Sequence, residues 1–180
     1  NARIVLKIMA NLRVAVLGGG MWGCVLAQHL AHKSKVRLWE FVPALTASLK
    51  KTRRLKHIPG FRLDDSVLVT NDLVEACQDV DLILFVLPSR ALAATAKRIR
   101  KIKLPKSVIA VNASKGIEPV TLATMGDIIA REIPSLRGKV WTLTGPSFAR
   151  EVARGVPTGL LLGGPSGPQA KALVSLLDGG

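Results

Sequence analysis

The stretch VAVLGGGMWG, residues 14–23, is the part of the sequence that most clearly indicates the fold. Its first four residues form a short apolar run of the kind found in buried strands, and helical apolar spacing begins at Trp22. Between them Gly18, Gly20 and Gly23 make the pattern G-x-G-x-x-G. In a strand–loop–helix unit these glycines permit a tight turn, a close approach of backbone to a pyrophosphate, and packing of helix on strand. The pattern predicts a dinucleotide site at the helix start, where free N–H groups and the helix dipole attract phosphate.

A second strand is expected at Val36–Trp39, and Glu40 stands at its end. A carboxylate in this place accepts hydrogen bonds from the adenosine ribose and repels a 2′-phosphate. Glu40 therefore favours NAD as the cofactor. NADP remains possible, because Arg37 and the basic helix expected over Ala44–Lys56 could accept a phosphate.

The rest of the chain continues the alternation of strand and helix. Further strands are expected at Val67–Val69, Leu82–Leu87, Val108–Val111, Val140–Leu143 and Thr158–Leu162. Further helices are expected at Trp22–Lys33, Asp72–Gln78, Arg90–Lys101, Leu122–Glu132, near Phe148–Arg154 and at Pro168–Leu177. Strands without polar alternation, interleaved with helices, predict a Rossmann-type, doubly wound α/β fold with a mainly parallel sheet and helices on both faces.

The two ends of the chain suggest its organisation. Residues 1–8 find no partner in this scheme, and Met9 resembles a natural start, so residues 1–8 are interpreted as extraneous or leader sequence. Residues 9–180 form the expected dinucleotide-binding domain. The chain stops just after its last helix, which suggests a cut at a domain boundary.

Composition narrows the class of protein further. The chain carries 26 Lys and Arg against 12 Asp and Glu, a net charge of +14, and 48% hydrophobic residues. This balance excludes a disordered tail and favours anionic ligands. No apolar run reaches the roughly 20 residues of a membrane span. Cys24 and Cys77 fit a reducing compartment, and packing is the expected role of Cys24. No metal-ligand cluster is visible.

Two basic runs, residues 50–56 and 97–103, raise the alternative of nucleic-acid binding. The second run belongs to a helix with Leu92, Ala96 and Ile99 on one face. Its Lys and Arg residues, Arg98 among them, are interpreted as the solvated opposite face. No aromatic residue interleaves with either run, so specific nucleic-acid binding is not expected.

Four blocks carry a resemblance to a known family. They are GGGMWG at 18–23, LPS at 87–89, NASKGIE at 112–118 and LTGPSFAREVARGVPTG at 143–159. In this order they resemble the N-terminal, NAD-binding domain of the NAD(P)-dependent glycerol-3-phosphate dehydrogenases. The resemblance implies interconversion of sn-glycerol 3-phosphate and dihydroxyacetone phosphate for glycerophospholipid synthesis, in the cytoplasm. It also implies a C-terminal helical substrate domain, absent from this chain, through which a homodimer could form.

The resemblance also assigns roles to single residues. Met21, Trp22 and Phe41 would contact the dinucleotide, and Gly145, Ser147 and Ala149 would lie along its nicotinamide side, the first two also binding substrate. Lys115 would reach both substrate and cofactor and act in catalysis. An ammonium there can stabilise the alkoxide that forms when hydride adds to a ketone, or donate the proton.

Two alternatives to this activity stay open at the level of sequence. One is another two-domain dehydrogenase with the same cofactor fold, acting on a hydroxy or keto acid. The other is a non-catalytic module that binds dinucleotide or polyanions.

Overall fold

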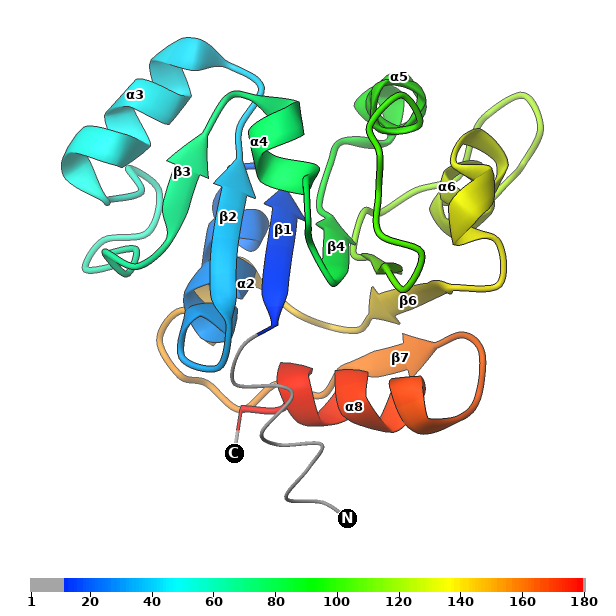
Figure 1. The fold of residues 1–180 in the computed structure, drawn as a ribbon. Coiled ribbons are helices and arrows are strands. Elements are labelled where there is room, and N and C mark those ends of the chain that lie inside the picture. Colours follow the sequence, from blue (N-terminus) through cyan, green and yellow to red (C-terminus); the bar gives the residue numbers. More distant parts are fainter. Residues whose placement is uncertain (1–11, 180) are drawn as a thin grey trace.

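The computed structural model describes residues 12–179, so the interpretation of residues 1–8 lies outside the described part. Seven strands form one sheet in the order β3-β2-β1-β4-β5-β6-β7 (Figure 1). The strands are β1 (Arg13–Leu17), β2 (Lys35–Trp39), β3 (Leu68–Thr70), β4 (Leu82–Phe85), β5 (Ile109–Asn112), β6 (Val140–Thr144) and β7 (Leu161–Gly163). The pairs from β3 to β6 are parallel, whereas β6 and β7 are antiparallel. The predicted mainly parallel sheet is confirmed.

Helices cover both faces of this sheet. They are α2 (Met21–Ala31), α3 (Pro43–Thr52), α4 (Leu73–Cys77), α5 (Ser89–Ile99), α6 (Met125–Glu132), α7 (Ala149–Val152) and α8 (Pro168–Leu177), with a 3-10 turn at Pro134–Leu136. Val14 and Val16 pack in one apolar cluster with α2 and α8, while Ala15 and Leu17 pack in a second with α4, α5 and α6. Both faces of β1 are therefore buried, which explains its unbroken apolar sequence.

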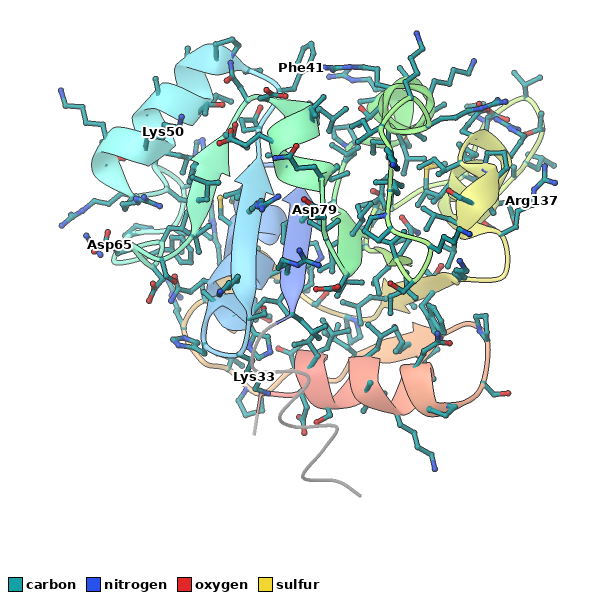
Figure 2. The ribbon with its side chains drawn as sticks, viewed as in Figure 1. Lys33, Phe41, Lys50, Asp65, Asp79 and Arg137 are labelled. Carbon is teal, nitrogen blue, oxygen red and sulfur yellow. The ribbon has the colours of Figure 1, made fainter. Side chains whose placement is uncertain are left out.

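The strand order creates a crevice at one edge of the sheet. From β1 the chain moves outward through β2 to β3, then returns to the other side of β1 with β4 and moves outward to β6. In open parallel sheets, ligands bind beyond the carboxyl ends of the strands at the point where the order reverses. Here that point lies between β1 and β4. In Figure 2 Phe41 lies above the arrowheads of β1 and β2, at this same edge.

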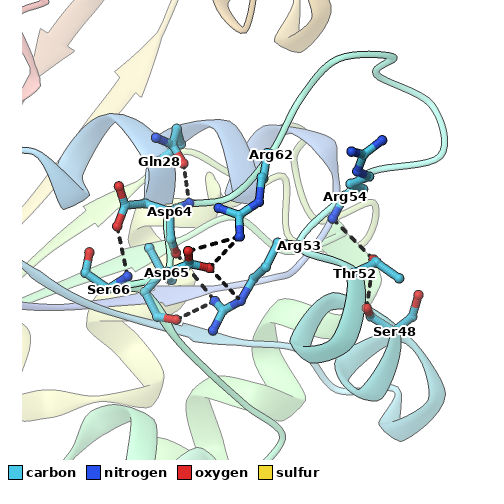
Figure 3. A network of polar contacts seen from close by, with 10 residues as sticks. Gln28, Ser48, Thr52, Arg53, Arg54, Arg62, Asp64, Asp65 and Ser66 are labelled. Atoms are coloured by element: carbon cyan, nitrogen blue, oxygen red, sulfur yellow. Dashed lines mark hydrogen bonds and ion pairs between the residues drawn. The ribbon is translucent and has the colours of Figure 1, made fainter.

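Helix α3 ends earlier than the sequence predicted. It was expected to continue to Lys56, but it ends at Thr52, and Arg53 adopts a left-handed conformation with φ of 55°. The Arg53 guanidinium donates to the carbonyl of Val67 at 2.7 Å (Figure 3). This contact ties the helix end to the segment that returns to β3, and it stabilises the turn that stops the helix.

Helix α6 begins later than predicted, at Met125 instead of Leu122. Leu122 has a φ of 56°, which no residue of a right-handed helix adopts. Thr124 and Asp127 form a capping box, in which each side chain satisfies a backbone N–H of the other residue. This cap fixes the true start of the helix.

The last strand also differs from the expectation of Thr158–Leu162. Strand β7 is shifted to Leu161–Gly163 and runs antiparallel to β6. Gly145, just after β6, packs so closely on the segment before β7 that a Cβ there would lie 2.7 Å from the carbonyl oxygen of Gly159. The end of β6 and the start of β7 therefore meet at one place, so β7 must run back along β6.

Helix α8 packs against α2 in the first of these two apolar clusters. The Lys33 ammonium, just after α2, donates to the carbonyls of Ser175 and Asp178 at 3.2 and 2.6 Å. Figure 2 shows Lys33 beside the end of α8. Within residues 12–179, no helix combines the length and the apolar character that crossing a bilayer requires.

Candidate dinucleotide cleft

The glycine loop joins β1 to α2, and two of its glycines are required by packing. Gly18 has a φ of 122°, and a Cβ there would lie 2.3 Å from the carbonyl oxygen of Val86. A Cβ on Gly23 would lie 1.8 Å from the carbonyl oxygen of Gly18. These two positions hold the loop against β4 and the helix against the loop, as the sequence pattern predicts.

Gly20 serves a different purpose. It is the N-cap of α2 with extended backbone (φ −69°, ψ 179°), and a Cβ built there meets nothing within 4 Å. Among the residues that the structure describes, no side chain caps the helix, and its first turn holds no acidic residue. The N–H groups of this turn are therefore available to an anion, and the space in front of Gly20 fits the diphosphate of a dinucleotide.

Glu40 holds the loop from the side of β2. The carboxylate is buried, at 9% exposure, and accepts hydrogen bonds from the backbone N–H of Gly19 and of Val42, each at 2.9 Å. A Cβ on Gly19 would come within 2.8 Å of the Glu40 Oε2 atom, so Gly19 leaves the room that this contact needs. Each carboxylate oxygen has two lone pairs, so acceptor capacity remains for a ribose hydroxyl.

Replacing Glu40 by glutamine is expected to lower the free energy of unfolding by about 1–3 kcal/mol. The amide has one acceptor oxygen, and its NH₂ group would face one of the two buried N–H donors. Urea unfolding of both proteins measures the difference. Glu151→Gln, at an exposed position on α7, is the matched control and should leave the free energy of unfolding unchanged. Equal stability of Glu40→Gln and the parent chain would contradict the role of Glu40 in holding the glycine loop.

A cleft of about 960 Å³ runs along this edge of the sheet, within the range of about 300–1,000 Å³ typical of cofactor sites. It passes from the end of β2, across the glycine loop and the end of β4, to the loop after β5 and the start of α7. Most of the residues proposed from the sequence line it: Gly18, Gly20, Met21, Trp22, Gly23, Glu40, Phe41, Lys115, Ser147 and Ala149.

A second hollow of about 420 Å³ adjoins the cleft at the ends of β5 and β6. Gly145 lines this hollow and not the main cleft, whereas Trp22, Lys115 and Ser147 line both. Lys115, Gly145 and Ser147, the three residues predicted to bind substrate, therefore all line this hollow. Gly145 does not line the adjoining cofactor cleft. Its close approach to Gly159 gives it a structural requirement as well.

Lys115 is held at the junction of the two hollows by a network of polar contacts around its neighbour Ser114. The Ser114 hydroxyl accepts from the backbone N–H of Leu87 at 2.9 Å and donates to the carbonyl of Phe85 at 3.2 Å. Asn112 accepts from the Ser114 N–H at 3.0 Å. These bonds join the loop after β5 to the end of β4. They position the backbone next to Lys115, which is exposed and lines both hollows.

Sequence reasoning missed one wall of the cleft. Helix α5 contributes Arg90, Ala91, Ala94, Thr95 and Arg98. The prediction that Arg98 lies on the exposed face of the helix is confirmed, as it is for Lys97 on the same turn, but the sequence did not predict that Arg98 also lines the cleft. The sequence did contain a signal for this wall. The small residues Ala91 and Ala94 lie together on a side of the helix separate from its buried core face.

The thiols are not part of this chemistry. Cys24 donates to the carbonyl of Gly19 at 3.3 Å, and burial, helped by the charge of Glu40, raises the pKa of this thiol to about 12. Burial likewise raises the pKa of the Cys77 thiol to about 12. Both side chains are protonated at neutral pH, in agreement with the packing role expected for Cys24. Within the described residues, no group of three His, Cys, Asp or Glu side chains could hold a metal ion.

Comparison with known proteins shows the family to which the chain belongs. Residues 13–167 match the family model described as NAD-dependent glycerol-3-phosphate dehydrogenase N-terminus. A relative from Syntrophobacter fumaroxidans, named glycerol-3-phosphate dehydrogenase (NAD(P)+), is 40% identical over 171 residues, which are 93% of this chain and 50% of the relative. A relative from Lactobacillus delbrueckii subsp. bulgaricus, named glycerol-3-phosphate dehydrogenase (NAD(P)+) 2, is 39% identical over 154 residues, or 81% of this chain and 44% of the relative.

The fold agrees with a solved structure of the same kind. The crystal structure of glycerol-3-phosphate dehydrogenase from Coxiella burnetii superposes with a TM-score of 0.84 at 27% sequence identity. The match covers 94% of this chain and 52% of that one. The chain therefore spans about half the length of the proteins it matches.

Proposed function

Because the chain belongs to the NAD-dependent glycerol-3-phosphate dehydrogenase family, we propose that it is the cofactor-binding part of an enzyme that interconverts sn-glycerol 3-phosphate and dihydroxyacetone phosphate. The observation that carries this proposal is the open position of Gly20. It presents the uncapped start of α2 to a cleft that leads directly to Lys115. A phosphate-binding helix start is thus joined to a candidate catalytic cation in one continuous hollow.

Different residues of the cleft bind different parts of the cofactor. In this proposal, the N–H groups at the start of α2 bind the diphosphate, and Glu40 accepts from the adenosine ribose. Phe41, exposed at 66% beside the Glu40 end, covers the adenine. Met21 and Trp22 lie between these two parts of the cleft, and Ala149 lies toward the nicotinamide end. When bound, NAD(P) supplies or accepts the hydride.

Lys115 is the proposed catalytic residue. Addition of hydride to the C2 ketone leaves a negative charge on the oxygen, and an ammonium beside it stabilises that charge or donates the proton. Ser147 lines the same junction, so its hydroxyl can bind a polar group of the triose phosphate. Gly145 gives the substrate a surface without a side chain in the adjoining hollow.

We further propose a cytoplasmic enzyme of glycerophospholipid synthesis that dimerises through a C-terminal helical domain. These properties follow from the resemblance of the motif blocks to the family. The two buried free thiols suit a reducing compartment.

The 180-residue chain on its own is expected to bind dinucleotide but to turn over dihydroxyacetone phosphate at no more than about 1% of the rate of a full-length relative. The reason is that remote binding energy positions the reacting carbon, and gripping the phosphate is expected to fall to the helical domain. Oxidation of NADH followed at 340 nm, with the Syntrophobacter relative as the positive control, measures the rate. A rate close to that of the relative would contradict the proposal that this chain binds the cofactor while the helical domain binds the substrate phosphate.

A further inference from the structure

The charges that line the cleft are unevenly distributed, and their placement bears on which dinucleotide it accepts. The acidic residue is Glu40, and the cations are Arg90, Arg98 and Lys115. Lys115 belongs to the loop after β5, at the opposite end of the cleft from β2. The two arginines belong to α5, so among the described residues that line the cleft, any cation near the adenosine end comes from this helix.

Neither of the candidates for binding a 2′-phosphate that the sequence suggested is part of the cleft. The Arg37 guanidinium donates to the carbonyls of Glu75 and Gln78 at 2.9 and 2.7 Å, and so is held against the end of α4. The lysines of α3, Lys50 and Lys51, lie in its last turn and do not line the cleft. A different side chain has to supply the cation.

Arg98 is in the right place to do so. Its Cζ atom lies 5.7 Å from the centroid of the Trp39 ring, at the end of β2. The Trp39 ring is fixed by a hydrogen bond from its Nε1 to the carbonyl of Asn71 at 3.1 Å, and its edge contacts Phe41 with ring centroids 6.1 Å apart. Arg98 therefore stands at the end of the cleft that holds Glu40 and Phe41.

The other arginine is too far along the helix to share this role. Arg90 precedes Arg98 by eight residues, and eight steps of about 1.5 Å separate them by roughly 12 Å along the axis of α5. Arg90 lies in the first turn, beside the end of β4. Arg98 is in no ion pair with any of the residues that the structure describes, so its charge is free to pair with a ligand.

Glu40, by contrast, is less available to oppose a phosphate than its position in the sequence suggests. Its two oxygens already accept from the N–H groups of Gly19 and Val42, and these dipoles offset part of the negative charge. A guanidinium cannot lose its proton in a protein and matches phosphate oxygens with two parallel N–H donors. The balance of charge at this end of the cleft therefore favours an additional phosphate.

We propose that Arg98 is a selectivity residue, which binds the 2′-phosphate of NADP(H) and makes the chain accept NADPH at least as tightly as NADH. The inference rests on the proposed dinucleotide site and adds to it the residue that decides between the two cofactors. In this account Glu40 keeps its contact with the loop, and Arg98 supplies the charge that the 2′-phosphate needs.

The test compares the dissociation constants of NADPH and NADH for the 180-residue chain and its variants, measured by calorimetric titration. Arg98→Met keeps an unbranched apolar stem over Trp39 and removes the charge, and it is expected to weaken NADPH at least about 10-fold more than NADH. Arg98→Lys retains a charge and should recover part of the preference. Arg100→Met is the matched control, because it removes one positive charge from the exposed end of the same helix and does not line the cleft.

The outcomes separate the two proposals. A fall in NADPH affinity with NADH almost unchanged supports the role of Arg98, provided that circular dichroism shows the variant to be folded and Arg100→Met behaves like the parent. Equal weakening of both cofactors would mean that Arg98 stacks on the adenine, and would overturn the selectivity role while leaving the dinucleotide site intact. Binding of neither cofactor by the folded parent chain would overturn both proposals.

Discussion

Substitution of Gly20 by glutamate is expected to weaken dinucleotide binding by at least about 100-fold and to leave the fold intact. The new side chain enters the open space in front of α2, so it places a carboxylate where the diphosphate would lie. The introduced carboxylate and the diphosphate are both negatively charged and repel each other at close range. The side chain also fills the volume that the ligand needs. The backbone of Gly20 is extended, with φ −69° and ψ 179°, which any residue can adopt.

Calorimetric titration with NADH measures the loss of binding, and urea unfolding measures stability, which should change by less than about 1 kcal/mol. Gly60→Glu is the matched change of charge at an open glycine far from the cleft, although its φ of 83° adds some strain. It should leave NADH affinity unaltered. Undiminished binding by Gly20→Glu would show that the diphosphate lies elsewhere.

Gly23→Ala is expected to have the opposite effect, a loss of about 3 kcal/mol or more in the free energy of unfolding. The added Cβ would lie 1.8 Å from the carbonyl oxygen of Gly18, and backbone cannot move aside as a flexible side chain can. Helix α2 would have to shift away from the loop and from β1, whose residues pack beneath it. Any loss of cofactor binding would then follow from the loss of structure.

Urea unfolding followed by circular dichroism measures this prediction, and Gly126→Ala in α6 is the control. The three atoms nearest to a Cβ at Gly126 belong to side chains, the closest at 3.3 Å, and a side chain can move aside, so this variant should lose much less stability than Gly23→Ala. Gly23→Ala with the stability of the parent would contradict the close packing described for the loop. The two glycine variants together separate the ligand-binding part of the motif from its structural part.

The unit from β1 to Glu40 could be predicted from sequence because its determinants are local. Gly23 is required by Gly18 within the same loop, and Gly20 leaves open space at the start of α2, so the spacing of the motif specifies both positions. The mainly parallel sheet with helices on both faces followed from the alternation of strands and helices, whereas the order of the strands was not predicted. The family blocks added Lys115, which the fold brings to the same edge of the sheet.

What sequence could not predict depends on contacts between distant segments. Helix α3 stops at Thr52 because Arg53 reaches Val67, and no local signal specifies that bond. The reversal of β7 depends on the packing of Gly145 against Gly159. The exposure of Arg98 was predicted, but its place in the wall of the cleft was not, because helical periodicity only separates a buried face from the rest. It does not say which part of the remaining surface another element or a cleft will cover.

A fluorescence titration of the 180-residue chain with NADH and NADPH tests whether the cleft binds a dinucleotide. Trp22 and Trp39 line the cleft, whereas Trp141 does not and donates its Nε1–H to the carbonyl of Pro165. A reduced dinucleotide in the cleft is expected to quench the emission of the first two by energy transfer and to saturate at one molecule per chain. A folded chain whose emission shows no saturable change with either cofactor would contradict the assignment of this cleft as the dinucleotide site.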